Sequence, residues 1–237
     1  ISDKFLTWGW DDPKNNEIIA FGCPKLLDSK VSFDESGGLL IIGLSMPLFS
    51  YYMYSAVISA CQWTSYFNDQ VTFVSSLDKK IRINTLFRMA APDYGCGQED
   101  RWKDRKNQLE VVVEDSSSRP LADSISESRL VVSTYNATTF LETMAMDVPT
   151  VVFWNPEHWE LRGAAKSHFD DLRDVGILHY SSESAAKHVN NVWLDVGSWW
   201  KSGEVQRVRR KFCRRYSHIP TNGVDRMAEI CRVDGPS

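Results

Sequence analysis

Short apolar runs bounded by polar residues recur along this chain and restrict its fold more than any other feature. The clearest lie at residues 39–43, 129–133 and 150–154, and less regular ones lie at 81–87 and 109–113. Such runs are typical of strands in a parallel sheet that is covered on both faces. Segments with helical spacing lie at residues 51–77, 138–146, 157–174 and 182–195. This alternation predicts a Rossmann-like α/β fold, in which helices wrap both faces of a parallel sheet of about five to seven strands.

The composition is that of an ordinary globular protein. Hydrophobic residues make up 43% of the 237 residues and charged residues 24%, and the net charge of −4 argues against nucleic-acid binding. No apolar run reaches the roughly 18 residues that a membrane span needs. The five cysteines are widely spaced and form no metal-binding motif. We therefore expect no metal, no cofactor, no disulfide framework, and a reducing, cytoplasmic setting.

Three parts are expected along the chain. Residues 1–30 hold short apolar stretches around a polar turn, which indicates a linker or edge segment. Residues 31–200 contain the predicted sheet and form the main domain. Residues 201–237 form a basic helix and tail. Because the chain begins with Ile1 rather than Met, we expect that it is a fragment of a longer protein.

The basic helix is a charge cluster in an otherwise acidic chain. Residues 201–216 hold seven basic residues, with Glu204 as the one acidic residue among them. Such a run usually forms a solvated helix face. The alternative is peripheral contact with an anionic membrane or a lipid-phosphate acceptor, at the inner face of the membrane.

The segment after the fourth predicted strand carries the strongest functional signal. The strand ends at small hydroxylated residues, and a helix is predicted to begin at once. Free backbone N–H groups at a helix start bind anions, which indicates a phosphate site there. The residues that outline it are Thr134, Asn136, Thr138 and Thr139. Glu142 lies one turn further along the same face and suits a ribose diol, because a carboxylate accepts hydrogen bonds but repels phosphate. The alternative is a capped helix in which these residues are only structural.

Residues 133–153 resemble the C-terminal, donor-binding domain of GT-B glycosyltransferases. The shared pattern is a strand, the sequence Asn-Ala-Thr-Thr-Phe-Leu-Glu, the sequence Ala-Met-Asp-Val-Pro-Thr and a second strand. Segments at residues 4–10, 50–55, 93–95, 101–105 and 153–162 resemble a transferase family of bacterial O-antigen and surface-polysaccharide gene clusters. The resemblance implies a nucleotide-sugar donor whose ribose contacts Glu142.

The acceptor side of the reaction is assigned by the same resemblance. It implies that a glycan or lipid-linked acceptor, and the catalytic base, belong to a missing N-terminal half. This chain alone is then expected to bind nucleotide but to turn over poorly or not at all.

Two further loops enter the expected donor site through this resemblance. After the first strand, Ser45, Ser50 and Tyr51 are expected to face the donor phosphates, and the alternative is an aromatic-rich loop that packs on its neighbours. After the fifth strand, Glu160 and Arg162 are expected to contact the donor sugar, and the Arg side chain also suits a phosphate.

A third loop follows the second strand. Arg88 is expected to meet a donor phosphate there, and Tyr94 is counted with the donor-binding residues. The alternative for Arg88 is a surface position paired with Asp93. Related transferases that use cytidine nucleotides have His or another basic group in this region, and no His is present in this loop.

No Asp-x-Asp sequence occurs in the chain. This argues against the glycosyltransferase class that holds the donor diphosphate through a divalent metal ion. A metal-free site built from helix ends and basic residues is consistent with the sequence, and a chelator should then leave nucleotide binding unchanged. A sugar-nucleotide epimerase, a polyol-phosphate transferase and a non-catalytic nucleotide-binding module are the alternatives on the same fold.

Overall fold

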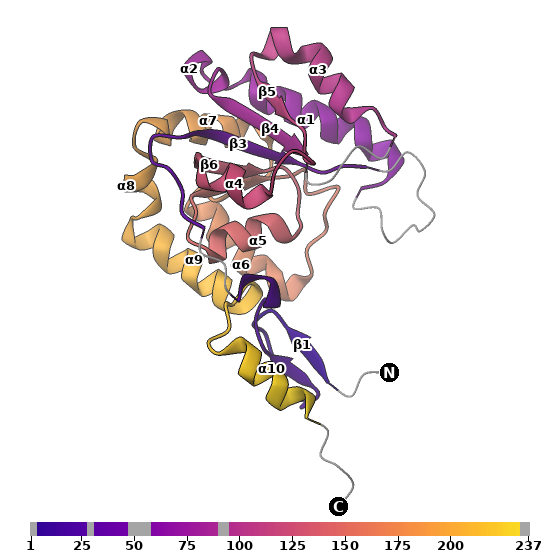
Figure 1. Ribbon diagram of the computed structural model, residues 1–237, viewed down its shortest axis with the longest axis vertical. Helices are drawn as coiled ribbons and strands as arrows, with labels where there is room; N and C mark the ends of the chain where they lie inside the picture. The colour runs from indigo at the N-terminus through magenta and orange to yellow at the C-terminus, as the bar shows by residue number, and fades with distance from the viewer. Residues whose placement is uncertain (1–3, 28–30, 47–57, 90–94, 233–237) are drawn as a thin grey trace, which may run out of the picture.

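The computed structural model describes residues 4–27, 31–46, 58–89 and 95–232. Its main body is a parallel sheet between two layers of helices (Figure 1). The strands of this sheet are β3 (Gly38–Gly43), β4 (Thr85–Met89), β5 (Val112–Glu114), β6 (Ser128–Ser133), β7 (Thr150–Phe153) and β8 (Leu178–His179). The α-helices are α1 (Trp63–Ser75), α2 (Lys79–Arg82), α3 (Gln98–Leu109), α4 (Leu121–Ser126), α5 (Thr138–Ala145), α6 (Gly163–Asp174), α7 (Ser182–Val192), α8 (Val196–Trp200), α9 (Gly203–Tyr216) and α10 (Gly223–Cys231). Short 3-10 helices lie at η1 (Pro24–Leu26), η3 (Ala60–Gln62) and η4 (Trp193–Asp195).

The sheet has six strands in the order β5-β4-β3-β6-β7-β8, and every neighbouring pair is parallel. Counted along the chain within this sheet, the order is 3-2-1-4-5-6, which is that of a doubly wound Rossmann sheet. The prediction of a parallel α/β sheet wrapped on both faces is therefore confirmed.

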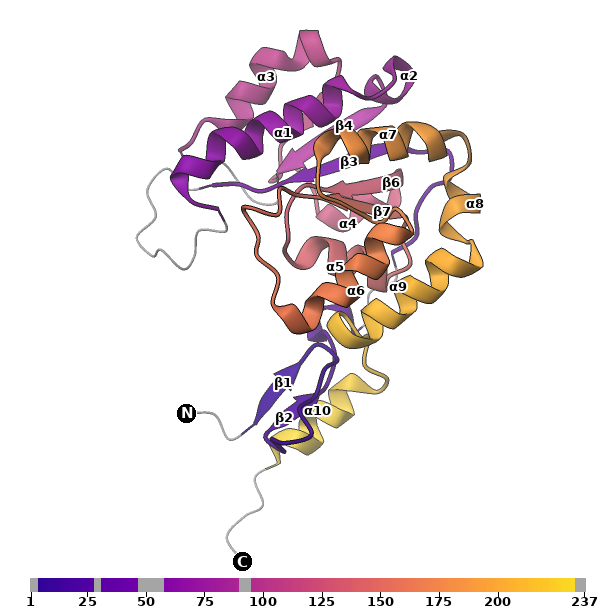
Figure 2. The same ribbon diagram turned by 180° about the vertical axis from the view of Figure 1, so that it is seen from behind.

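Each face of the sheet has its own core, because side chains alternate along a strand. Leu39 and Ile41 of β3 belong to one cluster of buried residues, which includes side chains of α1, α3 and α7. Leu40 and Ile42 belong to the other cluster, with side chains of α4, α5, α6 and α9. The view from behind shows α1 and α7 on one side of the strands and α5 and α6 on the other (Figure 2). Burial on both faces explains why the sequences of the strands are continuous apolar runs.

A small arm projects from this body beside the two chain ends (Figures 1 and 2). In it, β1 (Phe5–Thr7) and β2 (Ile18–Ala20) form a separate two-stranded parallel sheet. Helix α10 lies alongside, and Arg226 donates a hydrogen bond to the Ala20 carbonyl at 2.9 Å. Backbone bonds join the arm to the chain after α9: His218 N–H donates to Trp8 O at 2.8 Å and Cys23 N–H donates to His218 O at 2.7 Å. We call residues 4–27 together with α10 the arm.

Two predicted strands begin later than expected. The run at 81–87 begins inside the helical turn α2, because the N–H groups of Ile81 and Arg82 bond to the Asp78 carbonyl. The run at 109–113 overlaps the end of α3, which stops where Glu110 takes a left-handed conformation with φ of 56°. In both cases a β-branched composition is overridden by the preceding helix, whose packing decides where the strand begins.

Further differences lie around α6. The predicted helix over 157–174 begins only at Gly163, and the residues before it form the loop after β7. Beyond α6, β8 is a two-residue edge strand between the helical segments predicted at residues 157–174 and 182–195. Two residues are too few to show a strand pattern in the sequence.

Candidate functional site

The carboxyl ends of β3 and β6 define a crevice in the sheet. These two strands are neighbours, yet the helices that follow them lie on opposite faces, α1 on one and α5 on the other. In doubly wound sheets, ligands bind where the strand connections diverge in this way. The crevice lies between the residues after Gly43 and the residues after Ser133.

The floor of the crevice is a network of buried hydroxyl and amide groups around Thr134. Its Oγ1 lies 2.8 Å from the Tyr66 hydroxyl and 2.9 Å from Gln70 Nε2, and it donates to the Ile42 carbonyl at 3.1 Å. Burial raises the pKa of the Tyr66 phenol, so its proton stays in place as a hydrogen-bond donor. Thr134 was expected in the donor site, and the structure places its hydroxyl in this network between β3, β6 and α1.

The chain leaving β3 is held by side chains that the sequence did not single out. The Tyr66 hydroxyl accepts the Leu44 N–H at 2.7 Å. Gln98 accepts the Met46 N–H at 2.7 Å and donates to the Leu44 carbonyl at 3.0 Å. Ser45 lies between these anchored residues and is 7% exposed. In the sequence, the one feature that could have indicated Gln98 is the glycine before it. Gly97 takes a left-handed conformation, with φ of 63°, directly before the start of α3. Ser50, Tyr51 and Tyr94 lie outside the described residues.

The start of α5 has the features of an anion site. Ala137 precedes the helix in an extended conformation, and no side chain caps the helix. The first N–H groups of α5 therefore lack the usual side-chain acceptor. Asn136 is half-buried and Thr138 is exposed beside these groups. The positive end of the helix dipole adds to their attraction for a phosphate.

Thr139 faces inward from the first turn of α5. Its Oγ1 lies 2.8 Å from the Tyr135 hydroxyl. Burial raises the pKa of Tyr135 to about 12, so this hydroxyl stays protonated. This hydrogen bond holds the loop between β6 and α5 in place. Thr139 therefore positions the backbone of the candidate site.

Glu142 lies one turn further along α5, on its outer face. It is 8% exposed, and both of its oxygens contact Lys25 of η1, Oε1 at 2.9 Å and Oε2 at 2.8 Å. The carboxylate thus faces the arm rather than the core of the main body. Sequence analysis had not paired it with Lys25, because 117 residues separate the two.

Arg88 is buried and bound within the protein. Its guanidinium donates to Glu114 at 2.7 Å and to Ser124 at 3.0 Å, and also to the carbonyls of Ser116 and Arg119 at 2.9 and 2.7 Å. Burial alone would raise the pKa of Glu114, but the hydrogen bonds from Arg88, Ser124 and Arg119 lower it. Arg88 is therefore not the surface residue considered above, and both terminal nitrogens of its guanidinium are bound within the protein. We leave it out of the candidate site.

The loop after β7 closes the carboxyl edge of the sheet. Glu160 and Arg162 are both exposed in it, within reach of solvent-borne ligands. Trp159 is 8% exposed and its ring meets Tyr66 edge-on, with centroids 5.9 Å apart. Among the described residues, neither Trp159 Nε1 nor His158 Nδ1 has a hydrogen-bond partner. Buried polar atoms are rarely left unpaired, and these two belong to the loop at the carboxyl edge of the sheet.

The basic helix α9 belongs to the main body. Val205, Val208 and Phe212 pack into the core beside α5 and α6. Arg209 is also buried, and it donates to the Met144 carbonyl near the end of α5 at 2.6 Å. The exposed face carries Arg207, Arg210, Lys211 and Arg214, of which Lys211 pairs with Asp171 at 2.7 Å.

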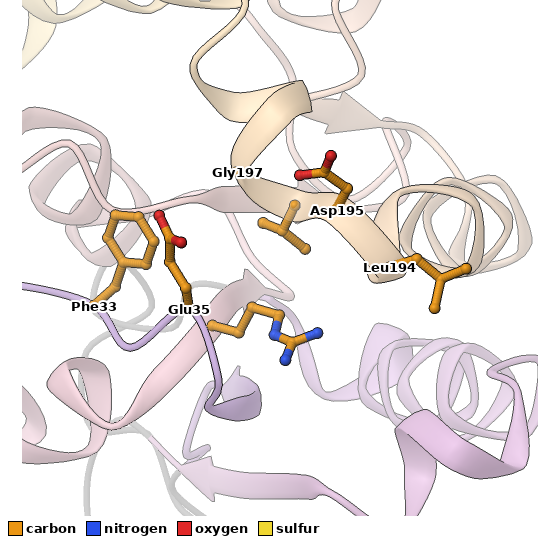
Figure 3. A pocket seen from close by; sticks show the side chains of 7 residues that line it. Phe33, Glu35, Leu194, Asp195 and Gly197 are labelled. Carbon is orange, nitrogen blue, oxygen red and sulfur yellow. The ribbon is translucent and has the colours of Figure 1, made fainter.

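A pocket at the opposite, amino edge of the sheet is unsuited to the chemistry described above. It has a volume of about 140 Å³ and is lined by Glu35, Arg129, Asp195 and their neighbours (Figure 3). Its charges are neutralised locally: Glu35 pairs with Lys201 at 2.6 Å, and Asp195 accepts hydrogen bonds from Ser198. We therefore place the candidate site at the carboxyl edge.

Within the described residues, no three His, Cys, Asp or Glu side chains gather closely enough to hold a metal ion. In the same ranges, the helices are too short or too polar to cross a membrane.

Comparison with protein families agrees with the sequence resemblance at the level of transferases. Residues 1–227 match a family model described as LIC12162 family transferase. No curated protein matches the chain.

Proposed function

The chain belongs to the LIC12162 family of transferases, and from this premise we propose that it transfers a glycosyl group from a nucleotide-sugar donor. The observation that carries the proposal is the junction of β6 and α5 at the crevice beside β3. A strand that runs directly into an uncapped helix at the divergence point of a doubly wound sheet is a phosphate-binding arrangement. The donor diphosphate is assigned to this helix end.

The helix end contributes to both binding and catalysis in this proposal. A helix N-terminus stabilises an anion by about 0.3–1 kcal/mol when exposed and up to about 2 kcal/mol when partly buried. During transfer, the bond between the sugar C1 and the diphosphate oxygen breaks while an acceptor hydroxyl oxygen bonds to C1. Negative charge then develops on the departing diphosphate, where preorganised N–H groups stabilise it most. The hydroxyl proton passes to a base that we do not assign.

The sugar end of the donor is assigned to the loop after β7. Glu160 can accept hydrogen bonds from sugar hydroxyls, and Arg162 can pair with a carboxylate or phosphate group. Both are exposed at the carboxyl edge, as a substrate-facing position requires. The resemblance of the wider sequence supports a role in surface-polysaccharide or O-antigen synthesis, with a glycan or lipid-linked acceptor.

The helix end can be tested with one substitution and a matched control. Ala137→Asp places a carboxylate at the N-cap of α5, where Asp stabilises helices but repels phosphate. We expect the free energy of unfolding to be unchanged or raised, and the affinity for a nucleoside diphosphate to fall at least about tenfold, equal to about 1.4 kcal/mol. Ala137→Asn, which caps without the charge, should lose less.

Calorimetric titration of UDP, CDP, GDP and ADP, with and without chelator, measures these affinities. Equal affinity in the parent and Ala137→Asp would contradict the assignment of the diphosphate to this helix end. With acceptor supplied, release of a nucleoside diphosphate supports glycosyl transfer. Release of a nucleoside monophosphate would instead identify a polyol-phosphate transferase, because the phosphoryl group would then move with the polyol.

A further inference from the structure

A second cleft lies between the arm and the main body, next to the start of α5. It has a volume of about 340 Å³. Its walls come from three separate parts of the chain: the arm supplies Phe5, Leu6, Thr7, Trp8 and Trp10, α5 supplies Thr138 and Leu141, and α9 supplies Tyr216. We call this the arm cleft.

Aromatic rings dominate the walls of the arm cleft. Phe5 is 55% exposed, and its ring lies beside Trp10 with centroids 6.3 Å apart and planes at 46°. Trp8, Trp10 and Tyr216 are each only partly buried. An apolar hollow of this size with several accessible rings suits a flat, weakly polar ligand, because stacking removes ring faces from water on both partners.

The arm cleft adjoins the assigned phosphate site. Thr138 lines the cleft and is also the first residue of α5, whose N–H groups lack a side-chain cap. Leu141 lines it one turn further along the same helix, directly before Glu142. A ligand that occupies both places must carry a flat ring at one end and phosphate at the other.

A nucleotide has this arrangement, so we propose that the arm cleft binds the nucleobase of the donor by stacking on the arm aromatics. The proposal rests on the proposed function, which assigns the diphosphate to the start of α5. Its volume lies at the lower end of the range for small-molecule pockets, about 300–1,000 Å³, which suits a nucleoside rather than a whole nucleotide-sugar. The arm thereby becomes part of the donor site.

The test compares two probes on the full chain. UDP, CDP, GDP and ADP carry a base, whereas inorganic pyrophosphate carries only the phosphates. Trp10→Leu should weaken the best-bound nucleoside diphosphate by about 5- to 140-fold, the equivalent of about 1–3 kcal/mol for one stacked base. Pyrophosphate affinity should stay unchanged.

Two further variants guard against an effect of misfolding. Phe5→Leu changes a residue that is already half exposed, so it should leave the fold intact and reproduce the selective loss. Leu194→Ala changes an 81% exposed residue at the opposite edge of the sheet and should bind both probes like the parent.

The outcomes separate this proposal from the proposed function. If Trp10→Leu and Phe5→Leu bind nucleoside diphosphate like the parent, the base does not occupy the arm cleft, and binding of an acceptor sugar there becomes the better reading. If they weaken both probes equally, the arm aromatics do not act through the base, and the proposal is again overturned. If the parent binds pyrophosphate, and binds nucleoside diphosphate no more tightly than pyrophosphate, the phosphate assignment stands and the arm cleft fails. If the parent binds neither probe, both fail together.

Discussion

Lys25 Nζ lies 2.9 Å from one carboxylate oxygen of Glu142 and 2.8 Å from the other, so an arm residue covers the carboxylate that we assign to the donor ribose. The side chain of Lys25 is 67% exposed, whereas that of Glu142 is 10% exposed. The lysine therefore lies on the solvent side of the pair and shields the carboxylate. A ribose diol that bonds to Glu142 must displace or share this contact.

The first prediction concerns Glu142 itself. Glu142→Ala should weaken nucleoside diphosphate binding by about 10- to 150-fold, since a hydrogen bond to a charged acceptor contributes about 1.5–3 kcal/mol. Glu142→Gln should lose less, because it keeps an acceptor. Thr139→Ala should lose less again, because its hydroxyl bonds to Tyr135 and the backbone N–H groups of α5 stay in place. Calorimetry decides the order, and parent-like binding by Glu142→Ala would remove the carboxylate from the site.

The second prediction concerns its partner. Lys25→Met should tighten nucleoside diphosphate binding by about 1.4- to 5-fold, because an ion pair of about 0.2–1 kcal/mol, in which the lysine is exposed to solvent, no longer competes for Glu142. Lys201→Met is the matched control, since it removes a lysine of similar exposure, 65% against 67%, from an ion pair with Glu35 at the far edge of the sheet. Weaker binding by Lys25→Met would show instead that the lysine contacts the ligand.

The third prediction separates stability from binding at Arg88. Arg88→Met leaves the buried Glu114 carboxylate with Arg119 as its one remaining arginine partner, which should lower the free energy of unfolding by about 3 kcal/mol, the lower end of the range for a broken buried pair. Arg88→Met combined with Glu114→Gln should lose less, since no buried charge is then stranded. Denaturant titration measures both variants. Below the unfolding transition, nucleotide affinity should equal that of the parent, and its selective loss would return Arg88 to the ligand site.

The fourth prediction is a pH dependence of stability. Burial, followed by the charge of His179, lowers the pKa of His188 from 6.5 to about 4. Between these values the unfolded chain binds a proton that the folded chain does not, so the free energy of unfolding falls as the pH drops from about 6.5 to about 4. In His188→Gln the fall over this window should be smaller. Some slope should remain, because burial also lowers the pKa of His179. Urea titrations across this pH range test it, and identical slopes would contradict the assignment.

The fifth prediction concerns the exposed face of α9. We propose that Arg207, Arg210 and Arg214 contact anionic lipid, because they line one face of the helix away from the core. Replacing all three with Gln should lower binding to phosphatidylserine vesicles by about two orders of magnitude, at about 1 kcal/mol per residue. Sedimentation with charged and neutral vesicles measures this. Undiminished binding by the triple variant would leave α9 as a solvated face.

Most of the fold could be predicted from the sequence, because the patterns that indicate its strands and helices are local. Continuous apolar runs such as that at Leu39–Ile42 arise when a strand is buried on both faces, and each run is followed within a few residues by its helix. The junction between β6 and α5 was readable for the same reason, since strand end, loop and helix start are adjacent in the chain. Where a local signal was ambiguous, as at Ile81, the preceding helix decided the outcome.

The site depends on contacts that no local pattern encodes. Composition and periodicity determined that this chain forms a parallel α/β sheet with a helix shortly after β6, whereas the structure showed that no side chain caps this helix. Only the tertiary structure decided that Arg88 would pair with Glu114 and that Glu142 would pair with Lys25. It also decided that aromatic residues of the arm would line one cleft with Thr138. Helix and strand preferences act over a few neighbouring residues, whereas these partners lie far apart in the chain or belong to different elements. Which of them meet is set by the packing of whole elements, because a buried charge or ring is stable only beside the partner that the fold brings to it.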